Sequence, residues 1–297
     1  MTPNPEQAEA RAALEAAGRL PDDEIDIATV ALQLARVDRP EADWRAAASL
    51  LSNIAREAVA RAAADRDADA GDVQRRRAVL AGLLHDAWGF AGDTQSYDDP
   101  ANANLIAVLQ RRRGLPVALG VLWLHAAGAA GWAAHGVDFP GHFLIGLAGQ
   151  NRGAPQGGPQ GAAQGAALVD VFSGGAAVAA QDLRALIKRV EGPRAELRPG
   201  LVAPMGRRAV LLRLQNNIKL RRLAARDIVG ALACAEDMLR LAPDHAGLWR
   251  EAGLMQHRLE RISAALASFD RALTLEPRGE AATRIRNLVE ELRGRLN

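Results

Sequence analysis

The sequence predicts an α+β protein with two parts: a mainly helical first domain with a small antiparallel sheet, over residues 1–195, and an all-α repeat domain over 207–297. Three observations lead to this prediction. Apolar residues recur with a helical period through the first ninety residues. Two short segments of β-forming residues flank the dipeptide Pro140-Gly141. Toward the C-terminus, small and aromatic residues return at the spacing of a known helical repeat.

The composition is that of a folded protein with one or two domains. Of the 297 residues, 49% are hydrophobic and 24% are charged, which leaves ample apolar surface for a core. No apolar run reaches the ~18 residues of a transmembrane helix, and the first residues lack the pattern of a secretory signal. Cys234 is the single cysteine, which excludes an intrachain disulfide and a cysteine-based zinc site. We therefore expect a cytoplasmic protein without a metal or another cofactor.

The charge is distributed unevenly along the chain. The net charge is only +2, but residues 1–70 carry 8 basic and 14 acidic side chains, whereas residues 207–297 carry 17 basic and 11 acidic ones. Opposite charges favour docking of one end of the chain on the other, or of an acidic partner on the C-terminal part.

The first ninety residues predict helices. An acidic run, Asp22 to Glu24, opens a helix that stops before Pro40, and acidic residues suit the positive end of a helix dipole. The alanine-rich segment 41–64 and the segment 71–88 continue the pattern, with apolar residues at a period close to 3.6.

The pattern changes after residue 88. Residues 89–104 are rich in turn formers, and a short helix over 102–114 ends at Gly114. Pro116 begins a nearly all-apolar segment to residue 131, which predicts a buried helix. The elements predicted after it are two strands within 132–147, a disordered Gly-rich loop at about 149–166, a strand at 167–175, a helix at 181–190 and a linker at 191–200.

A tetratricopeptide pattern of ~34 residues ends the chain. With Pro277 as its closing proline, the signature positions hold Trp249, Gly253, Ala265, Phe269 and Ala272. This defines a repeat over 246–279, a weaker one over 212–245 in which Ala235 replaces the phenylalanine, and a capping helix over 280–293. Because an array needs ~3 repeats to be stable alone, we expect the two to pack on the first domain.

Three motifs in the middle of the chain resemble one family. They are Tyr97-Asp98-Asp99-Pro100 with Asn102 and Asn104, then Arg113-Gly114-Leu115-Pro116, and then Pro140-Gly141-His142-Phe143. With the helical N-terminus and the C-terminal repeats, they resemble the SirB-type bacterial proteins, which join a transglutaminase-like domain to tetratricopeptide repeats. The resemblance implies a cysteine-protease-like fold for the first domain and a regulatory role without an established reaction.

Active members of the transglutaminase-like superfamily use a Cys-His-Asp triad. The resemblance places His142 and Asp170 in the last two positions, as a pair within hydrogen-bond reach near the start of the buried helix. The thiol belongs at that start, where the helix dipole lowers its pKa, but residues 115–118 read Leu-Pro-Val-Ala. We therefore predict a catalytically silent scaffold with a remnant dyad. Further candidates for its pocket are Tyr97, Asn102, Asn104, Arg113 and Pro116.

We expect the scaffold to bind a protein partner through its repeats, and two other functions stay open. A hydrolase or transferase could use His142 and Asp170 without a thiol nucleophile. A nucleic-acid-binding regulator could use the basic segment 207–226, although no aromatic residue is interleaved there for base stacking. The same segment offers Lys219 and Arg222 as contacts for an acidic protein partner.

Overall fold

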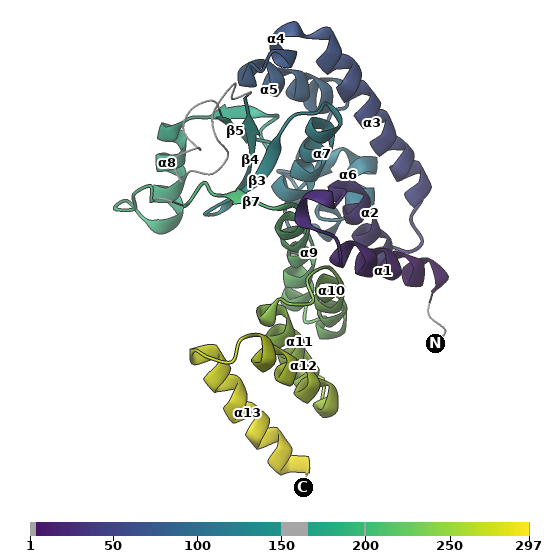
Figure 1. The fold of residues 1–297 in the computed structure, drawn as a ribbon, viewed down its shortest axis with the longest axis vertical. Helices are drawn as coiled ribbons and strands as arrows, with labels where there is room; N and C mark the ends of the chain where they lie inside the picture. Colours follow the sequence, from purple (N-terminus) through teal and green to yellow (C-terminus); the bar gives the residue numbers. More distant parts are fainter. Residues whose placement is uncertain (1–3, 150–165, 199, 297) are drawn as a thin grey trace. The chain divides into compact units, whose positions relative to one another are not determined.

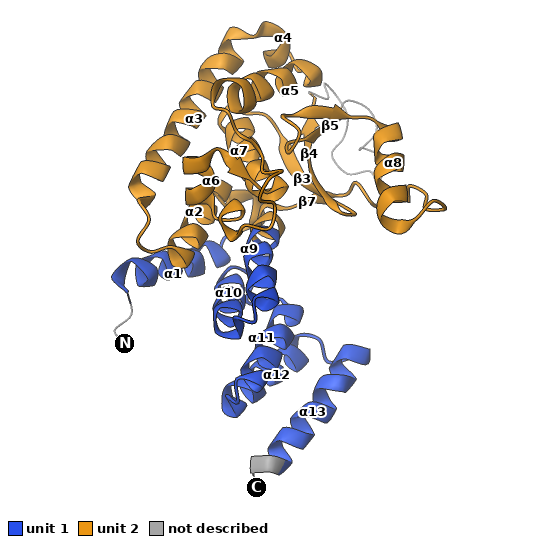
Figure 2. Cartoon of the chain, turned by 180° about the vertical axis from the view of Figure 1, so that it is seen from behind, with its two compact units in different colours: residues 1–20, 212–297 blue, residues 21–211 orange. Residues whose placement is uncertain are grey.

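The computed structural model describes residues 4–149, 166–198 and 200–296, so most of the predicted Gly-rich loop at 149–166 lies outside the described residues. The chain forms two compact units (Figure 2). The sheet unit comprises residues 21–211, and the helical unit comprises residues 1–20 and 212–297. A mainly helical α+β unit joined to an all-helical array confirms the predicted fold class.

Aspartates begin four helices of the sheet unit. The side chain of each aspartate accepts a hydrogen bond from a backbone N–H in the first helical turn, a group that otherwise has no partner. The four are Asp26 before α2 (Ile27–Asp38), Asp43 before α3 (Trp44–Ala64), Asp65 before α4 (Arg66–Asp69) and Asp72 before α5 (Val73–Ala81). A π-helical turn, Gly82–Ala87, extends α5, so the helical character predicted for the first ninety residues is confirmed.

Helix α7 (Pro116–Ala129) is the centre of the sheet unit. Pro116 occupies its first position, where a missing N–H has no consequence. Buried residues surround the whole helix, because α2 and α3 lie on one side of it and the sheet on the other (Figure 1). Gly120 brings α7 close to strand β4 (His142–Ala148): a Cβ atom at Gly120 would lie 2.2 Å from Cε1 of Phe143.

The sheet has five strands in the order β6-β5-β4-β3-β7, each antiparallel to its neighbours. The other strands are β3 (Ala134–Phe139), β5 (Ala166–Asp170), β6 (Ala176–Val178) and β7 (Pro204–Met205). Strands β3 and β4 form the predicted hairpin, which turns at Pro140-Gly141. Gly141 has a φ of 71°, a conformation that glycine adopts without strain.

The predicted single strand at 167–175 is wrong in its second half. Strand β5 ends at Asp170, and the chain turns back through residues 171–175 into β6. The Asp170 carboxylate causes the turn, because it accepts hydrogen bonds from the backbone N–H groups of Phe172 and Ser173. Helix α8 (Ala180–Glu191) then covers the face of the sheet opposite α7, with Leu183 and Ile187 packed on it.

A short parallel ladder lies beside the start of α7. It joins β1 (Ala91–Gly92) to β2 (Arg113–Gly114), and helix α6 (Leu105–Arg111) precedes β2 in the chain. The sequence predicted only turns and a short helix here, because two-residue strands are too short to show a period of two.

The helical unit contains the predicted hairpins. Its helices are α1 (Pro5–Gly18), α9 (Arg207–Ala224), α10 (Ile228–Leu241), α11 (Ala246–Arg258), α12 (Ile262–Leu275) and α13 (Glu280–Leu296), with the unit boundary after Leu211 inside α9. Ala265 and Phe269 are fully buried, and a Cβ atom at Gly253 would lie 2.4 Å from the Phe269 ring. These signature residues therefore form the core of the α11–α12 hairpin, as predicted.

Helix α1 packs on α10, although the sequence assigned it to the first domain. Its buried residues are Ala10, Leu14 and Ala17. At Gly18 the two helices touch closely, because a Cβ atom there would lie 2.0 Å from the carbonyl oxygen of Arg240. The acidic N-terminal segment thus supplies a helix that covers apolar surface of α10.

Candidate functional site

The start of α7 is the place where the transglutaminase-like resemblance puts a thiol. Leu115 caps the helix, and Pro116, Val117 and Ala118 form its first turn, so no thiol is present there. Val117 and Ala118 are buried, and Cys234 is buried within α10 of the helical unit. The position therefore offers no nucleophile for a covalent acyl intermediate.

Asn102 ties the preceding loop to this helix start. Its backbone carbonyl accepts a hydrogen bond from the N–H of Leu115 at 2.9 Å, and its Nδ2 donates to the carbonyl of Ser96 at 2.6 Å. Arg111 donates to Asn102 Oδ1 at 3.2 Å and lies 3.0 Å from the Asp93 carboxylate. The Asp93 carboxylate accepts a hydrogen bond from the N–H of Ser96, and this bond is the main cause of its lowered pKa. These polar groups satisfy one another, so they stabilise the loop in place.

The other pocket candidates have contacts with several different elements of the sheet unit. Asn104 caps α6 and donates to the carbonyl of Ala35 in α2, so it joins two helices. Tyr97 is 48% exposed and meets the Phe172 ring edge-on, with 5.9 Å between ring centroids. The exposed Arg113 donates to the carbonyl of Gly89.

His142 and Asp170 lie on neighbouring strands. The β4–β5 register pairs Ile145 with Val169. Continued by one residue, it places Asp170 opposite Leu144, so that Asp170 and His142 are diagonal neighbours on the same face of the sheet. That face carries Leu144 and α8, whereas the next residue, Phe143, packs on α7. Both oxygens of Asp170 have local partners, since Ser173 Oγ donates to Oδ2 at 2.7 Å and backbone N–H groups donate to Oδ1. A hydrogen bond between His142 and Asp170 stays a prediction.

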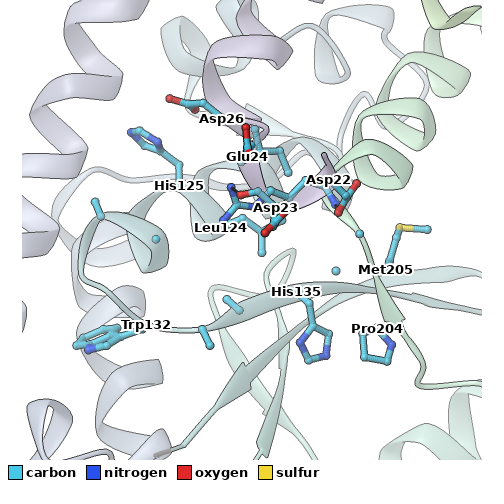
Figure 3. Close-up of a pocket in the computed structure, with 18 residues that line it drawn as sticks. Asp22, Asp23, Glu24, Asp26, Leu124, His125, Trp132, His135, Pro204 and Met205 are labelled. Carbon is cyan, nitrogen blue, oxygen red and sulfur yellow. Dashed lines mark hydrogen bonds between the residues drawn. The ribbon is translucent and has the colours of Figure 1, made fainter. Parts of the chain in front are cut away.

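A cavity of about 680 Å³ lies at the other end of α7, beside the acidic run 22–24 (Figure 3). Asp22 accepts hydrogen bonds from the first two N–H groups of α9, both at 2.8 Å. Among the labelled side chains of Figure 3, His125 and His135 point away from Asp22 and Asp23. His125 Nε2 lies 3.0 Å from the carbonyl of Leu51, and burial lowers the pKa of His135.

Imidazoles and carboxylates therefore line this cavity, but within the described residues no hydrogen bond or ion pair joins one to the other. Over the described part of the chain, no group of three or more His, Cys, Asp or Glu side chains is arranged to hold a metal ion. No sequence pattern indicates this cavity, because an acidic run is also typical of the start of a helix.

The two residues predicted to bind an acidic partner have contacts inside the helical unit. Lys219 is 3% exposed and pairs with Glu251 of α11, and Arg222 donates to the carbonyl of Gly230 in α10. Both side chains join α9 to a neighbouring helix. Their role in partner binding stays a prediction.

A second cavity, of about 440 Å³, lies within the helical unit. Helix α11 contributes Trp249, Ala252 and Gln256, α10 contributes Glu236 and Leu239, and the end of α1 adds a further wall. Trp249 occupies a repeat-signature position, which gives no reason to expect a cavity beside it. The cavity depends on α1, whose contact with α10 no local sequence pattern indicates.

Comparison with known proteins agrees with this architecture. The model of the transglutaminase-like superfamily matches residues 45–216, and a tetratricopeptide repeat model matches residues 218–290. A UPF0162 protein of Vibrio cholerae is 27% identical over 270 residues, which are 91% of this chain and 93% of the relative. A UPF0162 protein of Pseudomonas aeruginosa is 30% identical over 189 residues, 61% of this chain and 64% of that protein.

One relative from an animal shares only a short stretch. F-box only protein 21 of Mus musculus is 35% identical over 63 residues, which are 21% of this chain and 10% of that protein. No solved structure matches the chain at the significance that these relatives reach. Within the described residues, no helix has both the length and the apolar character needed to cross a bilayer.

Proposed function

The chain belongs to the transglutaminase-like superfamily, and we propose that it is a catalytically silent member that binds a protein partner through its tetratricopeptide unit. The role is that of a scaffold, in which partner binding and not acyl transfer is the activity. We further propose that the protein is of the SirB type, acts as a regulator and works in a reducing cytoplasm, where its single cysteine stays a thiol.

The start of α7 carries the first half of this proposal. Acyl transfer through a thioester requires a thiolate at a helix N-terminus with a histidine base within reach. Residues 115–118 supply no sulfur or hydroxyl group, and Pro116 and Ala118 cannot act as nucleophiles. The polar residues nearby, Asn102, Arg111 and Asp93, hydrogen-bond to one another.

The helical unit supports the second half. Stacked helical hairpins present long surfaces on which partner proteins bind. Leu220 on α9 and Leu254 on α11 are 53% and 49% exposed, so each helix presents a large apolar side chain to solvent. Exposed apolar side chains at regular positions of a repeat suit a protein partner.

Site-specific photo-crosslinking in producing cells tests this function. Benzoylphenylalanine replaces Leu220 or Leu254 in the helical unit, and Val59 of α3, which is 49% exposed, serves as the matched control. We expect a discrete covalent adduct from the helical-unit positions and none from Val59. An adduct formed only at Val59, or none at either helical-unit position, would contradict binding through the repeats.

A further inference from the structure

The cavity in the helical unit has an apolar floor that is held in a fixed shape. Trp249 donates a hydrogen bond from Nε1 to the carbonyl of Pro243 at 2.7 Å, which fixes its ring beside Leu239 and Ala252. Gln256 and Ser268 hydrogen-bond to each other at 2.7 Å, so these buried polar groups satisfy one another. Such a floor accepts an apolar side chain or the methylene stem of a long polar one.

Two lining residues of opposite charge, Arg240 and Glu15, already form an ion pair with each other. The Arg240 guanidinium pairs with Glu15 of α1 and lies 3.3 Å from the Asp237 carboxylate. Arg11 of α1 lies 3.0 Å from the same Asp237 carboxylate. The two arginines therefore have acidic partners, and neither is needed to balance a further carboxylate.

Glu236 is the carboxylate left at the edge of this cavity. Within the described residues it has no hydrogen-bond partner, and Arg240, Arg11 and Arg261 act on it only through space. Burial, and then the negative charge of Asp237, raise the pKa of Glu236. A cation beside Glu236 would stabilise its ionised form.

We propose that this cavity receives a lysine or arginine side chain of the partner protein, with the methylene stem on Trp249 and Leu239 and the cationic group on Glu236. The proposal rests on the proposed function, because it names the chemistry by which the helical unit recognises its partner. A cation over a tryptophan ring gains further attraction, and Trp249 lines the same cavity as Glu236. Arg19, exposed at the end of α1, lies at the same cavity and favours a partner segment whose neighbouring residues are neutral or acidic.

Fluorine NMR of the full chain labelled with fluorotryptophan tests this contact. Trp249 is the only tryptophan in the helical unit, and the substitution Trp249→Phe assigns its resonance. The probes are octapeptides that differ at one central position, Leu-Lys, Leu-Gln or Leu-Glu, in an otherwise neutral sequence. We expect the lysine peptide to shift the Trp249 resonance at millimolar concentration, and the glutamate peptide to leave it unchanged.

Charge substitutions at Glu236 give the sharper result. Glu236→Gln should weaken binding of the lysine peptide about tenfold, as expected for loss of one charged contact. Glu236→Lys should abolish that binding and bring binding of the glutamate peptide. Glu290→Gln, an exposed carboxylate on α13, is the matched control and should bind as the unchanged protein does.

Three outcomes would overturn the inference. They are equal binding of all three peptides, binding of the lysine peptide that Glu236→Gln leaves intact, and no shift of the Trp249 resonance by any peptide. None of them bears on the photo-crosslinks from Leu220 and Leu254. A crosslinked partner together with one of these outcomes means that the helical unit binds its partner at another surface.

Discussion

The guanidinium of Arg11 lies 3.0 Å from the carboxylate of Asp237, a residue 226 positions later in the chain. Asp237 is 2% exposed, and burial raises its pKa, so its charge depends on the two arginines beside it. The ion pair joins α1 to α10 within the helical unit, to which the first twenty residues belong. The remote N-terminus therefore contributes to the stability of the C-terminal repeats.

Removal of Arg11 should destabilise the helical unit. Arg11→Ala leaves the buried Asp237 carboxylate with Arg240 alone, and we expect a loss of about 1–3 kcal/mol in the free energy of unfolding. Urea unfolding followed through the fluorine resonance of Trp249, in the chain labelled with fluorotryptophan, measures this loss. Arg258→Ala, at an exposed arginine of α11, should change the value by less than about 0.5 kcal/mol. Equal effects of the two substitutions would show that the ion pair does not hold α1.

The stability of the helical unit should depend on the ionisation of Glu236. Because folding raises the pKa of Glu236, its ionised form costs stability at neutral pH, and that cost disappears as the pH falls through the raised value. Glu236→Gln should therefore be more stable than the unchanged protein at neutral pH. The difference should vanish below the ordinary glutamate value of 4.5. Urea unfolding across this range tests it, and a difference that grows on acidification would have the wrong sign.

Asn102 should be important for the stability of the sheet unit. It is fully buried, and Asn102→Ala leaves the Arg111 guanidinium and the Ser96 carbonyl without one partner each. We expect a loss of about 1–3 kcal/mol in the free energy of unfolding. Gln95→Ala, at an exposed side chain of the same loop, is the control in the same urea titration. A change as small as that of the control would mean that the loop does not need Asn102.

The unchanged protein should show no iodoacetamide-sensitive acyl transfer, because the start of α7 has no thiol and Cys234 is buried. Ala118→Cys, made with Cys234→Ala, places a thiol there at a position that is 0% exposed. We expect iodoacetamide to label this thiol far more slowly than one at the exposed Thr94 in the same background. Acyl transfer by the unchanged protein, or labelling of Ala118→Cys as fast as at Thr94, would contradict a silent and closed site.

Cleavage in the segment 192–198 should not separate the two fragments. Each unit contains residues from both sides of such a cut, since residues 1–20 belong to the helical unit and residues up to 211 belong to the sheet unit. A protease site inserted after Arg194, an exposed residue, makes the cut specific. We expect the cut protein to elute from gel filtration as one species, as the uncut protein does. Two separate peaks would mean that neither the contact of α1 with α10 nor the pairing of β7 with β3 holds the fragments together.

The local structure and the absence of a nucleophile follow from the sequence alone. The apolar periods of residues 41–64 and 71–88 predict helices there, because a period close to 3.6 places apolar side chains on one face of a helix. The Trp249 repeat signature predicts a hairpin, because only small residues allow two helices to approach closely. The missing thiol at residues 115–118 needs no structure, since a nucleophile is a matter of composition.

Which distant residues come into contact depends on how the helices pack. The contact of Arg11 with Asp237 and the cavity that α1 closes beside Trp249 both depend on packing. A periodic pattern shows which face of a helix is apolar, but many apolar faces of similar width are available to cover it. The choice of α10 as the partner of α1 depends on shape at Gly18 and on one buried charge, and neither leaves a mark in the local sequence.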